Sequence, residues 1–274
     1  MPVPGIPVLN YHAIDPDVDA STRNVSVSLS SFREQMEWLH KEGYKTIGQK
    51  DLKEVIVSGK KLTEKYVLIT FDDGYYSLHQ YALPVLSGLG FTAALFLSTS
   101  FIGNTYNQKD FGFVSHDRQL TWGEIKDLLA NGWSVQSHGN RHERLNKLSP
   151  EDIKNEVTIS KNSIEQNLGT KVDSFAFPYG IYTSQVITQL KAAGYQFAYS
   201  VHSGKLFPKA GRYQLPRIEI NNMDTMDSFI TKVTTGYTSA SNARRSKIRD
   251  IIYANASVKD FIEKFTPMFG FGNH

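Results

Sequence analysis

The sequence contains no cysteine among its 274 residues. This absence excludes thiolate catalysis, disulfide bonds and any zinc site built on cysteine, so a metal would have to be held by histidines and carboxylates. The absence of cysteine is also compatible with an exported bacterial protein. No run of 18 apolar residues occurs, so we expect no transmembrane segment. The first five residues, MPVPG, lack the basic and apolar regions of a signal peptide, which leaves two alternatives: a cytoplasmic protein, or an exported one whose leader is not in this sequence.

The sequence also has no large excess of positive or negative residues, because the formal net charge is only +3. That value is too small to indicate a nucleic-acid partner, and we expect none. The glycine-rich patterns that bind phosphates are absent, so nothing supports a nucleotide site. With 40% hydrophobic and 21% charged residues, the composition is typical of a soluble globular protein with a substantial core.

Short apolar runs alternate with stretches of helical periodicity along the chain. This alternation predicts an α/β domain with a mainly parallel sheet, and the number of units favours a distorted (β/α) barrel of about seven strands, with an open doubly wound sheet as the alternative. We expect a catalytic domain over residues 1–235 and an extension over 236–274 that packs on the barrel. The predicted strands cover 6–9, 67–71, 93–97, 133–136, 172–177, 197–201 and 215–220, and the predicted helices cover 31–42, 79–89, 121–130, 149–168, 184–193 and 226–233.

Two of the predicted strands end in residues that can bind metal. Asp72 and Asp73 follow the apolar run 67–71, and His138 and His142 follow the strand over 133–136. The ends of parallel strands in a barrel converge on one mouth, and one carboxylate with two imidazoles is a sound ligand set for a divalent metal. Each signal has a common alternative, an ordinary Asp-Gly turn in the first case and a chance histidine pair in the second.

A third predicted strand ends in Phe177-Pro178-Tyr179-Gly180, where Pro and Gly predict a turn. Together with Thr70-Phe71-Asp72-Asp73-Gly74 and Ser137-His138-Gly139-Asn140-Arg141-His142, this segment resembles the motifs of the polysaccharide deacetylase family. That family is also called the NodB-homology domain or carbohydrate esterase family 4. The resemblance spans residues 4–220 and implies a NodB-type barrel.

The resemblance also implies roles for individual residues. Asp73, His138 and His142 would bind the metal, usually Zn²⁺ in this family, with Co²⁺ and Ni²⁺ as alternatives. Asp72 would be the general base, and the backbone N–H of Tyr179 would help to hold the oxyanion. These roles suit the residue types, because a carboxylate that does not bind the metal can take a proton, and a backbone donor can stabilise developing charge.

The sequence departs from the common family pattern in two places. Position 176 is Ala where the family usually has the arginine that orients the catalytic aspartate, and we expect Arg217 to take over this role by pairing with Asp72. The usual Leu-x-x-His motif does not follow Gly180. It occurs instead as Leu9-Asn10-Tyr11-His12, which resembles the poly-N-acetylglucosamine deacetylase subgroup with its last motif moved to the N-terminus. His12 would then be the general acid. The alternative for Arg217 is a structural salt bridge elsewhere in the protein. The alternative for His12 is a hydrogen-bonded histidine at the end of a strand, without a catalytic role.

The sequence thus predicts a metal-dependent hydrolase that removes N-acetyl groups from a polysaccharide containing N-acetylglucosamine, either an exopolysaccharide or a cell-wall glycan. A polymeric substrate of this kind predicts an extracellular or cell-surface enzyme, with peripheral association at most. Two other functions compete: an O-acetyl esterase acting on xylan, and a non-catalytic carbohydrate-binding module. The oligomeric state is not predicted.

Overall fold

The computed structural model describes residues 5–18, 22–60, 62–103, 118–207 and 210–238. Its centre is a sheet in which six parallel strands are hydrogen-bonded in chain order. These strands are β1 (Ile6–Tyr11), β5 (Lys65–Asp73), β6 (Ala94–Leu97), β7 (Ser134–Ser137), β8 (Ser174–Ala176) and β9 (Phe197–Tyr199). Two short strands extend the sheet: β4 (Tyr44–Thr46) lies parallel to β5, and β10 (Lys205–Leu206) lies antiparallel to β1.

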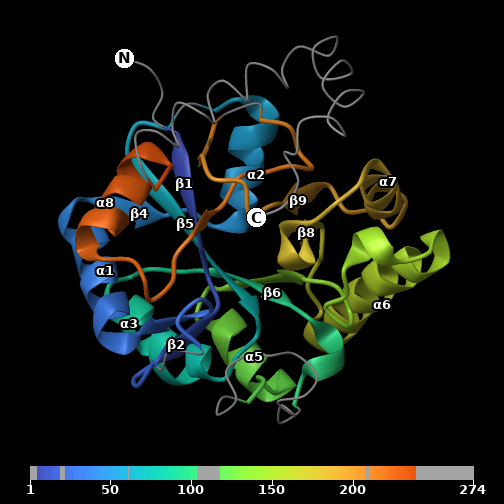
Figure 1. Ribbon diagram of the computed structural model, residues 1–274, viewed down its shortest axis with the longest axis horizontal. Coiled ribbons are helices and arrows are strands. Elements are labelled where there is room, and N and C mark those ends of the chain that lie inside the picture. Colours follow the sequence, from blue (N-terminus) through green and yellow to red (C-terminus); the bar gives the residue numbers. More distant parts are fainter. Residues whose placement is uncertain (1–4, 19–21, 61, 104–117, 208–209, 239–274) are drawn as a thin grey trace, which may run out of the picture.

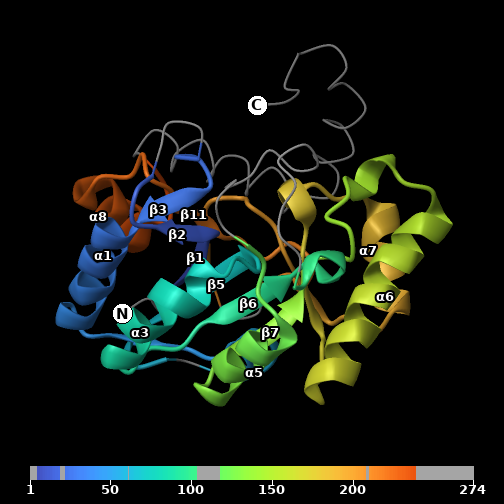
Figure 2. The same cartoon turned by 90° about the horizontal axis from the view of Figure 1, so that it is seen from below.

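Helices surround these strands (Figure 1). They are α1 (Leu29–Lys41), α2 (Gln49–Ser58), α3 (Leu83–Gly88), α5 (Trp122–Ala130), α6 (Pro150–Leu168), α7 (Ser184–Ala192) and α8 (Met226–Thr235). Figure 2 shows α1 with α8 on one side of the strands and α6 with α7 on the other. Short helical turns span Leu78–Ala82, Thr99–Phe101, Leu145–Lys147 and Pro178–Gly180, and a small parallel pair joins β2 (Ala13–Asp15) to β3 (Ser26–Ser28).

The helix boundaries follow local chemistry that is visible in the sequence. Helix α5 begins with a capping box, in which Thr121 accepts from the Glu124 N–H and the Glu124 side chain accepts from the Thr121 N–H. Helix α6 is capped by Ser149 and ends at Gly169, whose φ of 64° is left-handed. These signals start and stop the helices that hold the strand ends in place.

The strands bury both faces, each in a separate apolar cluster. Leu9, Ile69 and Phe175 point outward and pack against α1, α3, α5, α6, α7 and α8. Val8 in β1 and Leu68 in β5, which precede Leu9 and Ile69 in the sequence, point inward. They belong to the second cluster, which includes side chains of α2. Because side chains alternate along a strand, this pattern places Asn10, Thr70 and Asp72 on the inner side as well.

The segment from Leu215 to Glu219 closes the barrel. Leu215 bridges Tyr199 of β9, and β11 (Ile218–Glu219) pairs with β1. The chain therefore links the last and first strands of the curled sheet, and Arg217 lies in the middle of this link. The predicted barrel class is confirmed: in the described residues, the six strands and β11 make seven parallel strands around the barrel, and β4 adds a further parallel strand beside β5.

One expectation needs correction, and one helix was not predicted. The strand predicted over 215–220 is only a bridge at Leu215 and the two residues of β11, because Pro216 cannot donate to a ladder and Arg217 donates its N–H to the carbonyl of His202. The sequence interpretation also missed α2, although its apolar residues have helical spacing.

The predicted extension 236–274 lies outside the described residues, apart from the first three positions. Within the described part of the chain, no helix is long and apolar enough to cross a membrane.

Candidate active site

Asp72 and Asp73 end β5, and the backbone geometry there brings both carboxylates to one place. Asp73 has a left-handed φ of 71° and Gly74 a φ of 92°, so the alternation of side chains stops at Asp73. A side chain at position 74 would lie 2.7 Å from Leu97 Cδ2, which favours glycine. As a result Asp72 Oδ2 lies 3.9 Å and Asp73 Oδ1 3.6 Å from Nε2 of the same histidine, His138.

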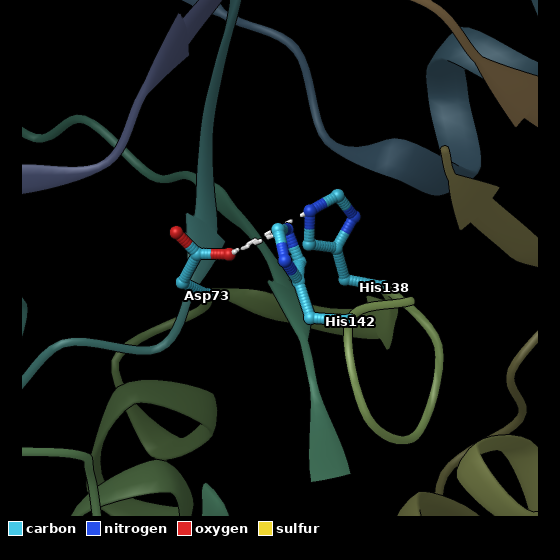
Figure 3. Close-up of side chains that lie close together, drawn as sticks. All are labelled: Asp73, His138 and His142. Carbon is cyan, nitrogen blue, oxygen red and sulfur yellow. Dashed lines mark ion pairs between the residues drawn. The ribbon is translucent and has the colours of Figure 1, made fainter. Parts of the chain in front are cut away.

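His138 and His142 reach the site from the loop after β7. Gly139 (φ 86°) and His142 (φ 55°) turn the loop so that the ring centroids lie 4.9 Å apart. His142 Nε2 lies 3.4 Å from Asp73 Oδ1, and Figure 3 shows the Asp73 carboxylate facing both imidazoles. The three side chains are buried, and their ligand atoms lie within 4.8 Å of one another.

The tautomer of His138 suits metal binding. Its Nδ1 lies 2.8 Å from the backbone carbonyl oxygen of Ala176. A carbonyl only accepts, so Nδ1 carries the proton and donates it, and the lone pair of Nε2 faces Asp73. The backbone of Ala176, at the position where the family usually has an arginine, thus orients a candidate metal ligand.

The electrostatics of the three residues also fit a divalent cation. Burial lowers the pKa of His138 to about 4 and that of His142 to about 4, so both rings are neutral near pH 7 and can bind metal. Burial raises the pKa of Asp73, and the charge of Asp72 adds to this effect. A divalent cation between Asp73 and two neutral imidazoles would offset the cost of a buried carboxylate beside a second one. Chemically, the cluster is a candidate site for such a cation.

Asp72 is held by Arg217 in a two-point ion pair. Arg217 Nη1 lies 2.7 Å from Asp72 Oδ1 and Nη2 lies 2.7 Å from Asp72 Oδ2, and both side chains are buried. Burial raises the pKa of Asp72, but the Arg217 guanidinium and then His138 outweigh that effect and hold the pKa far below its usual value. The carboxylate is therefore ionised and fixed in orientation.

His12 and Tyr179 lie at the same mouth. His12 directly follows β1, is partly exposed, and lies close enough for its charge to lower the pKa of Asp72, Asp73 and His142. Tyr179 has a left-handed φ of 59°, and its ring lies 4.7 Å from that of His142 and 4.2 Å from the Arg144 guanidinium carbon. All seven residues singled out from the sequence thus lie at one end of the barrel.

Sequence interpretation missed two buried residues that support this site. Asn10 Oδ1 accepts from Arg217 Nη1 at 2.8 Å, and Glu156 accepts three hydrogen bonds from the loop that carries the histidines. Strand alternation could have found Asn10, because it shares the inner face with Val8. Glu156 had only a weak signal, a carboxylate on the apolar face of an amphipathic helix.

Comparisons with known proteins agree with this geometry. The sequence profile described as "Polysaccharide deacetylase" matches residues 59–198. The chain is 31% identical over 216 residues to YxkH of Bacillus subtilis, whose name describes it provisionally as a polysaccharide deacetylase, and the match covers 79% of this chain and 71% of that protein. It is 26% identical to poly-beta-1,6-N-acetyl-D-glucosamine N-deacetylase of Escherichia coli, over 84% of this chain but only 39% of that protein.

A solved structure shares the fold. The deacetylase PplD of Streptococcus pyogenes, in complex with acetate, superimposes with a TM-score of 0.72 over 84% of this chain and 98% of that one, at 22% identity. At this level of identity the likeness shows the barrel and its topology.

Proposed function

The chain belongs to the polysaccharide deacetylase family, and on this premise we propose that it removes N-acetyl groups from a polysaccharide containing N-acetylglucosamine. The observation that carries the proposal is one cluster in which Asp73, His138 and His142 converge beside Asp72, a carboxylate that Arg217 holds ionised. The name of the Escherichia coli relative supports a β-1,6-linked polymer of N-acetylglucosamine as the substrate.

Asp73, His138 and His142 would hold the metal, and we propose Zn²⁺ because two neutral imidazoles and one carboxylate leave an open position on a tetrahedral ion. When bound, a divalent cation supplies Lewis acidity, which lowers the pKa of water and polarises the acetyl carbonyl. Asp72 lies beside these residues, and its pairing with Arg217 keeps it ionised and oriented, so we assign it to proton transfer rather than to ligation.

In the proposed reaction, the oxygen of a water molecule bonds to the acetyl carbon, the C–N bond breaks, and the products are acetate and a free amine. Asp72 takes the proton of the attacking water. His12, at the end of the neighbouring strand β1, gives a proton to the leaving nitrogen, which is too basic to leave as an anion. The backbone N–H of Tyr179 donates to the oxygen that becomes negative in the transition state.

The substrate suggests where the protein acts. A β-1,6-linked N-acetylglucosamine polymer at the cell surface, or a cell-wall glycan, would require an extracellular or cell-surface location, and we propose this location together with the activity. Each acetyl group removed converts a neutral amide into an amine that is protonated at neutral pH. The product would therefore carry positive charge and bind more strongly to anionic surfaces.

The test is an assay of the Zn²⁺-loaded protein that measures acetate and free amine separately. The substrates are β-1,6-linked N-acetylglucosamine oligomers, peptidoglycan fragments and acetylated xylan. We expect equal amounts of acetate and amine from the N-acetylglucosamine oligomers. Acetate from xylan without amine from either glycan would overturn the proposal in favour of an O-acetyl esterase, and absence of both products would argue against catalysis.

A further inference from the structure

Glu156 is a buried carboxylate on α6 that binds the loop carrying both histidines. It is 1% exposed. Its Oε2 accepts from the backbone N–H groups of Asn140 at 2.9 Å and Arg141 at 2.8 Å, and its Oε1 accepts from Arg141 Nε at 2.9 Å. Asn140 and Arg141 lie between His138 and His142, so the carboxylate is bonded to the turn that brings the two imidazoles together.

The other side of the same loop is held by the residues that follow β6. The carbonyl of Gly139 accepts from the Thr99 N–H at 3.2 Å, and that of Asn140 accepts from the Ser100 N–H at 3.0 Å and the Ser100 hydroxyl at 2.8 Å. The backbone groups of the loop are thus shared between two partners: residues 99–100 satisfy its carbonyls, and Glu156 satisfies two of its N–H groups. A single carboxylate oxygen of Glu156 has the two lone pairs needed to accept from both N–H groups at once.

The loop needs this external support because its own conformation is unfavourable. His142 has a left-handed φ of 55°, which costs a non-glycine residue about 1–2 kcal/mol. The spacing of four residues is not helical here, so no intrahelical hydrogen bonds fix the positions of the two rings. Ser137, the last residue of β7 before the loop, is hydrogen-bonded to Ser160, which lies on the same face of α6 one turn after Glu156. One face of α6 therefore anchors the loop at two points.

We propose that Glu156 is a positioning residue that presets the separation of His138 and His142 and thereby sets the affinity of the site for its metal. The proposal rests on the function proposed above, since it takes Asp73, His138 and His142 as the ligands. Glu156 contacts the loop between the ligands, so its effect reaches the metal through the backbone of residues 140 and 141. Supporting residues of this kind commonly change metal affinity by about 10- to 100-fold.

The experiment compares matched variants on the same helix. Glu156→Leu keeps much of the side-chain volume and removes both acceptor oxygens. Glu156→Gln retains one oxygen that can accept from both backbone N–H groups. The control is Glu165→Leu, because Glu165 also accepts a backbone N–H, from Val172 at 2.9 Å, but lies nine residues further along α6, about 13 Å from Glu156. The measurements are the Zn²⁺ dissociation constant, from competition with a chromophoric chelator, and the visible absorption spectrum of the Co²⁺-substituted protein.

We expect Glu156→Leu to weaken Zn²⁺ binding by about 10-fold or more and to alter the Co²⁺ spectrum. We expect Glu156→Gln to lose only about 2- to 10-fold, the equivalent of one hydrogen bond. Glu165→Leu should bind both ions as the wild type does. Wild-type affinity and spectrum in Glu156→Leu would overturn the proposal, as would equal losses in Glu156→Leu and Glu165→Leu, which would indicate a general effect on stability.

Folding is followed separately by circular dichroism of the metal-free proteins. If Glu156→Leu does not fold, Glu156→Gln decides, and wild-type affinity in that variant would overturn the proposal. Asp73→Ala distinguishes this inference from the proposed function. If the wild type and Asp73→Ala bind Zn²⁺ equally, the ligand assignment fails and the role of Glu156 fails with it. If Asp73→Ala abolishes tight binding while Glu156→Leu preserves it, only the role of Glu156 fails.

Discussion

Left-handed backbone conformations in residues other than glycine occur, within the described ranges, only at Asp73, His142 and Tyr179. Each such conformation costs about 1–2 kcal/mol relative to an ordinary one. Two of these residues are proposed metal ligands, and the third offers the proposed oxyanion donor. The strain therefore lies where three loops must turn a side chain or an N–H group toward one point, which supports treating these loops as one functional unit.

The role of Asp72 as a base is tested by Asp72→Asn. The amide cannot take a proton from water, so we expect acetate release to fall by about 10²- to 10⁴-fold. Zn²⁺ should still bind with a stoichiometry of one, because Asp73, His138 and His142 are unchanged. The variant will also be less stable, since it leaves the buried Arg217 without its anion, at a cost of about 3–5 kcal/mol. Acetate release at the wild-type rate by the zinc-loaded variant would remove Asp72 from the proposed mechanism.

The two-point pairing of Arg217 with Asp72 is tested by Arg217→Lys. Lysine keeps the charge but cannot make two parallel hydrogen bonds to one carboxylate. We expect kcat to fall by about 10- to 100-fold while KM changes little, because the substrate is not in contact with Arg217 but the base is misplaced. The control is Arg212→Lys, an exposed arginine near the same segment, which should leave both constants unchanged. A proportional rise in KM with constant kcat would contradict a role in orienting the base.

The role of His12 as an acid predicts a dependence on the leaving group. His12→Gln should lose about 10²-fold or more on the amide of N-acetylglucosamine, whose nitrogen must be protonated to leave. The same variant should hydrolyse 4-nitrophenyl acetate nearly as fast as the wild type, because a nitrophenolate leaves without a proton. Equal losses on both substrates would indicate that His12 acts at another step or supports the site structurally.

At the level of elements, the sequence predicts the strands that carry the site residues. It does not predict the contacts that support them, such as the contact between α6 and the loop after β7. Strands β5, β7 and β8 lie close to three of the strands that the sequence predicts, and Asp73, His138 and Tyr179 lie at or just after their ends. The apolar pattern around Arg217 predicts a full strand over 215–220. That pattern does not reveal that Pro216 lacks an N–H, or that the N–H of Arg217 bonds to the carbonyl of His202 instead of to a neighbouring strand. The contribution of Glu156 depends on how α6 meets a loop that lies close in space, and no local pattern encodes that contact.

Helix α2 illustrates an element that stabilises the barrel without contributing to chemistry. Leu52 is fully buried in the same inner apolar cluster as Leu68, the fourth residue of β5. Asp72 lies four residues after Leu68, about 13 Å further along the strand. We expect Leu52→Ala to lower the free energy of unfolding by about 2–5 kcal/mol and to leave the Zn²⁺ dissociation constant unchanged. Denaturant unfolding measures the free energy, and chelator competition on the same preparation measures the Zn²⁺ dissociation constant. If Leu52→Ala also weakened Zn²⁺ binding, the two ends of the barrel would be coupled.

At the scale of the whole molecule, the interior of the barrel divides into an apolar part and a polar part. The inner apolar cluster fills the part covered by α2. Asn10, Thr70, Asp72 and Arg217 form a buried hydrogen-bonded network at the mouth, next to the candidate metal ligands. A network of this kind is costly unless every member is satisfied, and here each charge has its partner. The asymmetry allows one end to provide stability while the other holds carboxylates that would repel each other without a cation.

Metal binding should therefore stabilise the entire fold. A ligand that binds only the folded state adds about 2.7 kcal/mol at a concentration of 100 times its dissociation constant. For a domain of this size, that gain raises the midpoint of thermal unfolding by about 5–10 °C. We expect calorimetry to show this rise when Zn²⁺ is added to chelator-treated protein, together with recovery of acetate release. Asp73→Ala should show neither effect, because the remaining histidines lack the carboxylate ligand. A midpoint that does not depend on Zn²⁺ in the wild type would contradict a folded-state metal site at Asp73, His138 and His142.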